Sequence, residues 1–388
     1  MRKRLVVAVS VIVLTGIGAT FWLGPEYTDR SMNRVDRIQP LPVVTDAARA
    51  LHQRLLVVDL HADPLLWRRD LMERLPYGQV DLPRLQEGNV SLQVFGSPTK
   101  TPRNLNYDSN PSDSDMLVWL TIFNGQPFRT WFSLYERARF HAHKLDALVA
   151  RSAGRMVTVR SASDLQRLLD ERKRGRPVVG GLMGLEGAHA LEGKLENLEG
   201  LYAAGYRMIG LAHFFDNEIS GSMHGEVKAG LTSLGRAVVQ RAETLGMIVD
   251  IAHASNAAVE DVFDMATRPV VVSHGGVRAI CDYNRNLSDA QLHRLAQNGG
   301  VIGIGYWDAA VCDPSPAGIV QAMTYVRGLI GIEHIGLGSD FDGTVTTRFD
   351  TSELVLLTQA LLDAGYTEDE IQLIMGGNAL RVLQNGLL

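Results

Sequence analysis

The sequence predicts an α/β protein, a (β/α)8 TIM barrel with a helical insertion between strands 2 and 3, preceded by an N-terminal membrane anchor helix. Eight short runs rich in Val and Ile, with little polar alternation, are typical of strands buried on both faces of a parallel sheet. Amphipathic segments separate them. The predicted strands are Leu56–Leu60, Val90–Phe95, Val178–Leu185, Arg207–Ala212, Ile248–Ala252, Val270–Ser273, Gly300–Gly305 and His334–Ser339.

The segments between these strands have the composition of amphipathic helices. A first helix over Thr45–Arg54 leads into the first strand. A doubly wound open sheet would also alternate strands and helices, but the glycine-rich phosphate-binding fingerprint that such sheets often carry is missing. The barrel is therefore the preferred fold. Its later predicted helices are Gly193–Ala204, Leu231–Leu245, Ala257–Met265, Asp289–Gln297 and Pro316–Ile330.

The connection between the second and third strands, residues 96–177, is far longer than a normal loop of a barrel. Helical composition over Asp113–Asn124 and Trp131–Ser152 predicts an insertion over the barrel mouth, and Ala162–Arg174 is expected to be the regular crossover helix. His141 and His143 fall on the insertion, where we expect packing or surface roles for them.

The N-terminus has the pattern of a membrane anchor. Arg2, Lys3 and Arg4 precede an apolar run over Leu5–Leu23, long enough to nearly cross a hydrocarbon core of ~30 Å. The basic start predicts a cytoplasmic N-terminus and an extracytoplasmic, periplasmic or cell-surface catalytic domain on a single-pass protein. A cleaved signal peptide is the alternative. We expect an anchor over 1–24, a linker over 25–42 and a barrel domain over 43–388.

Bulk composition limits the possible functions. The chain has 388 residues, 46% of them hydrophobic and 21% charged, with a net charge of −5. No basic domain stands out, so nucleic acid is not an expected partner. The two cysteines, Cys281 and Cys312, fit neither a zinc ribbon nor a disulfide framework, and the sequence leaves open whether they pair. Ligands of any metal site must then be histidines and carboxylates.

Polar residues that can bind metal or move protons end several of the predicted strands. In a closed barrel, all of these ends gather on the carboxyl-terminal face, where barrel active sites lie. Burying so many ionisable groups without partners would cost several kcal/mol each, and metal ions would satisfy them. The sequence therefore predicts a hydrolytic metal centre. The residues are His61 and Asp63, Glu186, His213, Asp250 and His253, His274, and Asp340 and Asp342.

The number of ligands indicates two metal ions. One site would take His61, Asp63 and Glu186, and the other Glu186, His253 and His274, with the Glu186 carboxylate bridging ions ~3.5–4 Å apart. Such a pair lowers the pKa of water and polarises a carbonyl. Asp340 is then the natural proton shuttle. His213 is left to stabilise a developing oxyanion.

These residues lie in segments that together resemble the membrane dipeptidases (renal dipeptidase), a branch of the metal-dependent amidohydrolase superfamily. The resemblance covers essentially everything after the linker. The segments are VVDLHADPLLW at 57–67, DLPRLQEGNVSLQVF at 81–95, GLEGAHAL at 184–191, GLAHFFDN at 210–217, VDIAHAS at 249–255, VVSHGGVRAICDYNRNLSD at 271–289, GLGSDFDG at 336–343 and GGNALRVL at 376–383.

The resemblance implies two zinc ions bridged by Glu186, with Asp340 as the acid/base and His213 as a residue that polarises the substrate. It also implies that Arg285 clamps the C-terminal carboxylate of a dipeptide, which suits the fork of a guanidinium. We expect Tyr306, at the end of the seventh strand, to line the substrate pocket. A homodimer is expected from the resemblance alone.

The expected function is therefore hydrolysis of small dipeptides, including ones with a C-terminal D-residue. Residues 214–225 and the insertion differ from the animal enzymes, which leaves specificity open. The C-terminus is no lipid-anchor signal, so the N-terminal helix would attach the protein to the membrane. The rival functions are an amidohydrolase for another amide or a lactone, and a catalytically silent extracytoplasmic binding protein.

Overall fold

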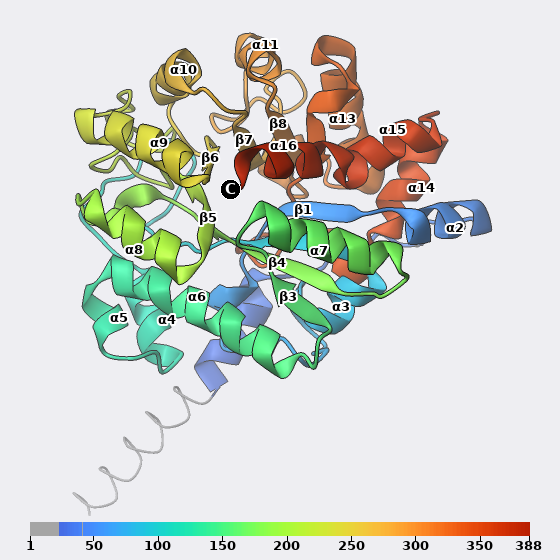
Figure 1. Cartoon of the computed structure of the whole chain (residues 1–388), viewed down its shortest axis with the longest axis horizontal. Helices are drawn as coiled ribbons and strands as arrows, with labels where there is room; N and C mark the ends of the chain where they lie inside the picture. The colour runs from blue at the N-terminus through green and yellow to red at the C-terminus, as the bar shows by residue number, and fades with distance from the viewer. Residues whose placement is uncertain (1–22, 41) are drawn as a thin grey trace, which may run out of the picture.

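The fold is a closed barrel of eight parallel strands, as the sequence predicts. A computed structural model describes residues 23–40 and 42–388. The strands pair in the order β2-β1-β9-β8-β7-β6-β5-β4, and a β2–β4 pairing closes the ring (Figure 1). The barrel strands are β1 Val57–Ala62, β2 Val90–Phe95, β4 Val179–Leu185, β5 Tyr206–Gly210, β6 Ile248–Asp250, β7 Val271–Gly275, β8 Val301–Ile304 and β9 Ile335–Leu337.

A ninth strand, β3 (Met156–Thr158), lies outside the ring and was not predicted. It pairs with residues 179–181 of β4, whereas β5 pairs with residues 183–185. β2 pairs with residues 180–183 of β4, so β3 and β5 lie on the opposite edge from β2. β3 lies between the insertion and the crossover helix, outside the alternation of strands and helices on which the sequence analysis relied.

Helices follow the strands around the outside of the barrel, and their starts are set by capping residues. The side chains of Thr232, Ser255, Ser288 and Ser315 each accept a hydrogen bond from a backbone N–H of the first turn. At these four helices the predicted starts agree with the observed starts within two residues, whereas α8, which has no side-chain cap, begins three residues later than predicted. The helices are α2 Asp46–Arg54, α3 Leu82–Glu87, α8 Glu196–Ala204, α9 Ser233–Leu245, α10 Asn256–Met265, α11 Asp289–Asn298, α12 Asp308–Val311 and α13 Pro316–Ile330.

The chain ends in three helices that the sequence analysis did not assign: α14 Val355–Asp363, α15 Glu368–Gln372 and α16 Asn378–Gly386. α16 contributes Ala379, Leu380, Val382 and Leu383 to a buried cluster with side chains of β1, β2, β4, β5, β6, β7 and β8. Because these strands surround the barrel axis, α16 closes the end of the barrel away from the polar strand ends.

The long connection between β2 and β4 holds the predicted helical insertion. Its helices are α4 Leu117–Phe123, α5 Arg129–Phe132 and α6 Leu134–Arg151, followed by β3 and the crossover helix α7 Ala162–Lys173. Figure 1 shows α4, α5 and α6 grouped at the lower left, where the described chain begins. His141 on α6 is buried and its Nδ1 lies 2.8 Å from Ser97 Oγ, whereas His143 is exposed. Both histidines thus have the expected packing and surface roles.

Residues 23–40, most of which the sequence analysis assigns to a linker, lie against the barrel. Residues 23–32 are helical, and Val35 forms a parallel bridge with Thr347. Buried Asp29 accepts a hydrogen bond of 2.9 Å from Arg69, and Arg37 pairs with Asp350 at 2.9 Å. This part of the chain is held by specific polar contacts.

The predicted anchor helix lies almost wholly outside the described residues, because 1–22 are not described. Within residues 23–40 and 42–388, the structure contains no helix with both the length and the apolar character needed to span a bilayer.

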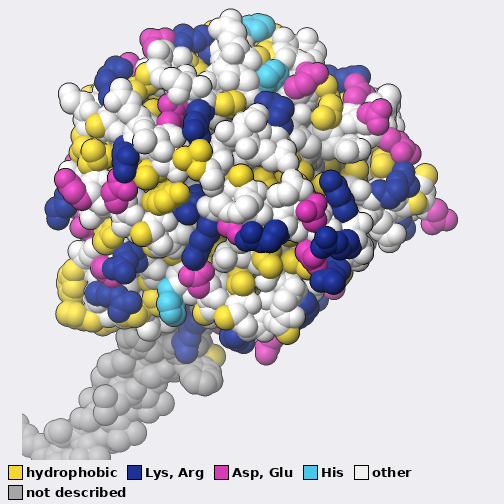
Figure 2. Space-filling model, viewed as in Figure 1, with side chains coloured by type: hydrophobic (Ala, Val, Ile, Leu, Met, Phe, Trp, Pro, Cys, Tyr) yellow, Lys and Arg dark blue, Asp and Glu magenta, His cyan; other side chains and the backbone are white. Residues whose placement is uncertain are grey.

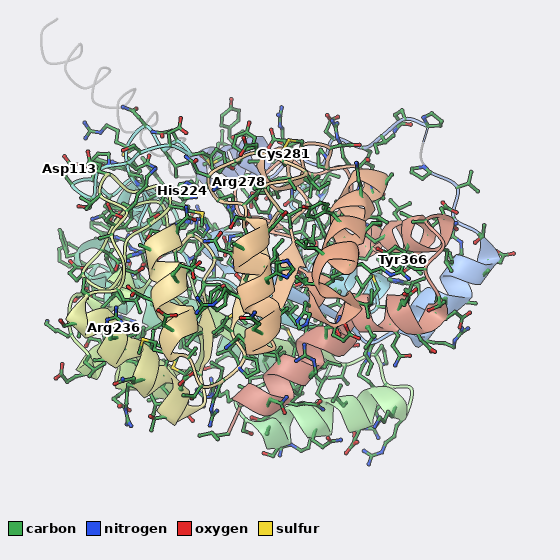
Figure 3. The ribbon with its side chains drawn as sticks, turned by 90° about the horizontal axis from the view of Figure 1, so that it is seen from above. Asp113, His224, Arg236, Arg278, Cys281 and Tyr366 are labelled. Atoms are coloured by element: carbon green, nitrogen blue, oxygen red, sulfur yellow. A yellow bond between two sulfur atoms is a disulfide. The ribbon has the colours of Figure 1, made fainter. Side chains whose placement is uncertain are left out.

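Cys281 and Cys312 form a disulfide, which settles the pairing that the sequence left open. It ties residues 276–288, the segment that carries Arg285, to the end of α12. Figure 3 shows Cys281 beside Arg278 at the upper edge of the molecule.

Candidate active site

Four histidines from four strand ends surround one carboxylate oxygen, Glu186 Oε1. Glu186 follows β4, and the histidines belong to β1, to the end of β5, to the end of β6 and to β7. All are buried. The distances from Glu186 Oε1 to the histidine Nε2 atoms are 3.6 Å for His61, 3.5 Å for His213, 3.2 Å for His253 and 3.4 Å for His274.

Two further carboxylates complete the cluster on the side of β1 and β9. His61 Nε2 lies 3.4 Å from Asp63 Oδ1 and 3.9 Å from Asp340 Oδ1. Both aspartates are buried. The structure thus brings together all the metal ligands and the proton shuttle that the sequence proposed.

Buried hydrogen bonds fix the ends of these strands. Asp59, on β1, accepts hydrogen bonds from the backbone N–H and the hydroxyl of Ser339, at 2.9 and 2.6 Å. Asp250 likewise accepts from the N–H groups of Ala252 and Ser273. Each aspartate therefore joins strands that carry site residues.

The backbone at two site residues is in the left-handed region. His253 has a φ of +62° and Asp340 a φ of +58°, which costs a non-glycine residue roughly 1–2 kcal/mol. Asp340 is held there by its N–H, which donates to the His61 carbonyl at 3.2 Å. Such outliers persist where the surrounding structure enforces them, and they concentrate at functional sites.

A glycine allows the end of β2 to approach the cluster. A Cβ at Gly96 would lie 2.1 Å from Asp63 Oδ1 and 2.7 Å from His61 Cε1. No other residue fits at this position without displacing both side chains.

Burial and mutual repulsion set the charges of the carboxylates. Burial, together with the Asp63 charge, raises the pKa of Glu186 well above its usual value. Burial also raises the pKa of Asp340 to about 7, against the opposing effect of His61. Burial would lower the pKa of His61, but the charges of Asp63, Glu186 and Asp340 raise it to about 10.

The remaining three histidines are held neutral. Burial lowers the pKa of His213 to about 3, and burial together with the Arg285 charge places the pKa values of His253 and His274 well below their usual range. Neutral imidazoles are the form that binds metal.

The donor atoms fit metal ions. His213 Nδ1 lies 3.3 Å from the Lys100 carbonyl, so it carries the proton and leaves Nε2 as a lone pair facing Glu186. His61 Nε2 and Asp63 Oδ1 are buried without a hydrogen-bond partner. In the metal-free protein a proton on His61 offsets the surrounding carboxylate charges, and a metal ion would take the place of that proton. Imidazole with carboxylate is a typical ligand set for zinc.

The potential ligands form three overlapping groups. Their donor atoms lie within 4.8 Å of one another in the sets His61–Glu186–His274, Glu186–His213–His253 and His61–Asp63–Asp340. The sequence analysis assigned His274 to the same ion as His253 and did not count His213 among the metal ligands. The geometry groups His274 with His61 and His213 with His253, so it does not separate His213 from the ligands.

Arg285 lies in the same buried site without an acidic partner. One guanidinium nitrogen donates to the His274 carbonyl at 3.0 Å, and the group stacks 4.5 Å from the ring centre of Trp307. Its Nε has no hydrogen-bond partner, and among the described residues no carboxylate pairs with it directly, although the charges of Asp340 and Glu186 act on it. A buried guanidinium with free donors suits an anionic ligand.

Tyr306 does not lie where the sequence analysis expected. Its side chain is fully buried, packs against Phe341 and Phe349, and is absent from the residues that line the cavity. β8 ends at Ile304, so strand alternation no longer sets the direction of the Tyr306 side chain. The prediction that Tyr306 lines the substrate pocket is corrected accordingly.

A cavity of about 630 Å³ opens onto the cluster. Asp63, Glu186, His213, His253, Arg285 and Asp340 contribute to its wall. Sequence reasoning missed several other aromatic and histidine side chains around the cluster, because they lie on loops without strand or helix periodicity. These are Trp67, Tyr107, Phe214, His224 and Trp307. Only Phe214 and Trp67 lay in the segments that carried the resemblance.

Comparison with known proteins identifies the family. Residues 45–386 match the membrane dipeptidases, peptidase family M19. Dipeptidase aclJ of Aspergillus oryzae is 30% identical over 355 residues, which are 85% of this chain and 78% of that protein. Human dipeptidase 3 is 32% identical over 218 residues, 52% of this chain and 44% of its own length.

Solved structures share the fold. The probable dipeptidase PvdM of Pseudomonas aeruginosa superposes with a TM-score of 0.72 at 22% identity, over 87% of this chain and 97% of its own. A metallopeptidase of Rhodobacter sphaeroides, solved with a phosphinate mimic of L-Ala-D-Ala, has a TM-score of 0.69 at 22% identity and covers 86% of this chain and 99% of its own. Because the family match spans nearly the whole barrel, the chain belongs to the membrane dipeptidases, the metallo-dipeptidases of peptidase family M19.

Proposed function

We propose that the chain is a binuclear zinc dipeptidase that cleaves small dipeptides, including those with a C-terminal D-residue. The observation that carries the proposal is the combination, in one cavity, of the histidine and carboxylate cluster around Glu186 with an unpaired buried arginine. The cluster suits a hydrolytic metal pair, and the arginine suits a substrate with a free carboxylate.

Each residue has a distinct role in this proposal. Glu186 would hold both ions, together with His61 and Asp63 for one ion and with His253 and His274 for the other. Two zinc ions in such a site supply water with a pKa near neutrality and polarise a carbonyl. The Asp340 carboxylate accepts a proton from the attacking water and delivers it to the leaving nitrogen.

The remaining side chains orient the substrate. The Arg285 guanidinium binds the C-terminal carboxylate of the dipeptide, because it has no acidic partner in the free protein. His213 lies at the cavity wall, where its imidazole can stabilise the charge that develops on the carbonyl oxygen.

Hydrolysis of L-Ala-L-Ala and L-Ala-D-Ala by the full chain, with and without a chelator, tests the proposal. We expect activity that the chelator abolishes, and two zinc ions per chain by metal analysis. If the metal-loaded protein cleaves no dipeptide, the dipeptidase proposal is wrong. Hydrolysis of other amides or lactones would then support the rival enzyme, and ligand binding without any turnover would support a receptor.

Arg285 separates a dipeptidase from an amidase for neutral substrates. Arg285→Gln should raise KM for L-Ala-L-Ala by roughly 10- to 100-fold, since it removes hydrogen bonds to a charged group. The same variant should change little with the C-terminal amide of that dipeptide. Arg236→Gln is the control, because Arg236 pairs with Asp261 on the outside of α9, far from Cys281 and the neighbouring Arg285 segment (Figure 3).

We also propose that residues 1–24 anchor the protein in a membrane and that the catalytic domain is extracytoplasmic. The basic residues before the apolar run support this orientation. The Cys281–Cys312 disulfide is consistent with an oxidising compartment. Fractionation of cells, with protease access from each side of the membrane, tests the proposal. Light scattering tests the expected homodimer.

A further inference from the structure

The cavity has two chemically different parts. Its ionisable residues come from the barrel strand ends and the segment of Arg285. Most of its apolar residues come instead from the loop after β1, from the insertion and from the N-terminal helical segment, and Phe214 and Val345 are the exceptions. The apolar set is Met32, Leu66, Trp67, Leu105, Met116, Leu117, Trp119, Leu120 and Phe123, here called the vestibule.

The vestibule is built on a small hydrophobic cluster of its own. Leu66 and Trp67 pack with Leu117, and Leu120 packs against them. The Trp67 indole donates to the Asp342 carbonyl at 2.7 Å, and Asn124 Nδ2 donates to the Leu66 carbonyl at 3.1 Å. Helix α4 is therefore fixed directly to the β1 segment that carries Asp63.

Several vestibule side chains are exposed although they face a cavity. Met32 is 46% exposed, Leu105 43%, Met116 39% and Trp119 54%. Apolar surface concentrated in a concavity beside polar groups is typical of a ligand site. A cavity of about 630 Å³ is in the range that holds drug-sized ligands, so it leaves room beyond an alanyl dipeptide.

The ring order of the strands places Trp67, and helix α4 that packs on it, across the site from Arg285. β6 lies four positions from β1 in the closed ring, and β7 lies four positions from β2, so these strands are opposite one another. Arg285 contacts His253 and His274, which follow β6 and belong to β7. Trp67 follows β1, and α4 follows β2. A dipeptide whose carboxylate binds Arg285 would therefore direct its amino-terminal residue toward the vestibule.

We propose that the vestibule binds a large apolar or aromatic side chain on the amino-terminal residue of the substrate. The proposal rests on the dipeptidase function proposed above and names its preferred substrate class. Such a side chain would cover Trp119 and Met32, which water contacts in the free protein.

The test compares two series of dipeptides with the full chain in detergent: Ala-Ala, Leu-Ala, Phe-Ala and Trp-Ala, and Ala-Leu, Ala-Phe and Ala-Trp. We expect kcat/KM for Phe-Ala to exceed that for Ala-Ala by roughly 10- to 100-fold, the factor that corresponds to burying a Phe side chain. No comparable gain is expected in the Ala-Phe series.

Two variants test whether the vestibule causes the preference for Phe-Ala. Trp119→Ala and Met32→Ala change exposed side chains and should leave folding intact. Each should lower kcat/KM for Phe-Ala by roughly 3- to 10-fold and leave Ala-Ala within twofold. Phe132→Ala is the matched control, because Phe132 is an exposed aromatic of α5 that does not line the cavity. Figure 2 shows hydrophobic side chains gathered in the lower-left region, where Figure 1 places α5.

The outcomes separate this proposal from the dipeptidase function. Hydrolysis of Ala-Ala without any preference for Phe-Ala would overturn the vestibule proposal and leave the dipeptidase function standing. A preference confined to the Ala-Phe series, or an equal loss for both substrates in Trp119→Ala, would also overturn it. If no dipeptide in either series is cleaved, both proposals are wrong.

Discussion

At the scale of single residues, Gly96 shows how little space the metal site leaves. Its backbone is in an ordinary region, so alanine is excluded only by the Cβ contacts with Asp63 and His61. Gly96→Ala should therefore displace the ligands and lower metal retention by roughly 10- to 100-fold, with a matching loss of activity.

Metal content after dialysis against a weak chelator measures this effect. Gly328→Ala is the control, because no atom lies within 4 Å of a Cβ there and the residue is inside helix α13. It should be neutral or slightly stabilising. If Gly96→Ala retains its full metal content, the end of β2 does not restrict the positions of Asp63 and His61.

Asp340 and Asp342 lie two residues apart, yet they should respond differently to the same substitution. Asp340→Asn removes the proposed proton shuttle, so kcat for Ala-Ala should fall by roughly 10²- to 10⁴-fold with little change in stability. Asp342 instead accepts hydrogen bonds from the N–H groups of Gln79 and Val80 and pairs with Arg69. Asp342→Asn should thus lower the free energy of unfolding by about 3–5 kcal/mol.

Turnover of Ala-Ala and urea unfolding, measured on both variants, distinguish these roles. A large stability loss in Asp340→Asn, with turnover retained, would remove Asp340 from the catalytic step.

At the scale of elements, helix α6 contains a buried histidine that makes stability depend on pH. Burial lowers the pKa of His141 from 6.5 to about 3, and the Lys144 and Arg137 charges act in the same direction. Between these values the unfolded chain binds a proton that the folded chain does not. The free energy of unfolding should therefore fall as the pH drops below about 6.5, by up to about 1.4 kcal/mol per pH unit, until about pH 3.

Urea unfolding at pH 7, 5 and 4, with a chelator present throughout, measures this slope. The slope of the free energy of unfolding against pH should be smaller for His141→Gln than for the parent protein, by the equivalent of up to one proton. The slope for His143→Gln, at an exposed position on the same helix, should equal that of the parent protein. Equal slopes in all three would show that His141 does not carry the effect.

At the scale of the whole molecule, the N-terminal segment is part of the folded domain and of the cavity. Asp29 pairs with buried Arg69, Asn33 accepts a hydrogen bond of 3.0 Å from the Thr344 N–H, and Met32 lines the cavity. Removing residues 1–42 should leave Arg69 short of a partner and cost about 3–5 kcal/mol of stability. Hydrolysis of Phe-Ala should slow as well, because the wall of the vestibule that contains Met32 is lost.

A chain that begins at residue 23 is the matched comparison, and it should keep both stability and activity. Thermal unfolding and kcat/KM for Phe-Ala, measured on the two truncated chains, check this prediction. Equal behaviour of both would mean that the segment contributes nothing beyond a linker.

The sequence by itself determined the barrel and its reacting groups. Buried parallel strands have continuous runs of Val and Ile, and in a barrel the residues at their carboxyl ends meet on one face. For this reason His61, Glu186 and Asp340 could be placed together from strand positions alone. The folded chain alone decided what surrounds them. These surroundings join residues that are far apart in the chain. Asp29 contacts Arg69, Gly96 lies against Asp63 and His61, and Trp119 and Met32 both line the vestibule. Tyr306 illustrates the same limit, because the direction of a side chain just after a strand depends on tertiary packing rather than on local pattern.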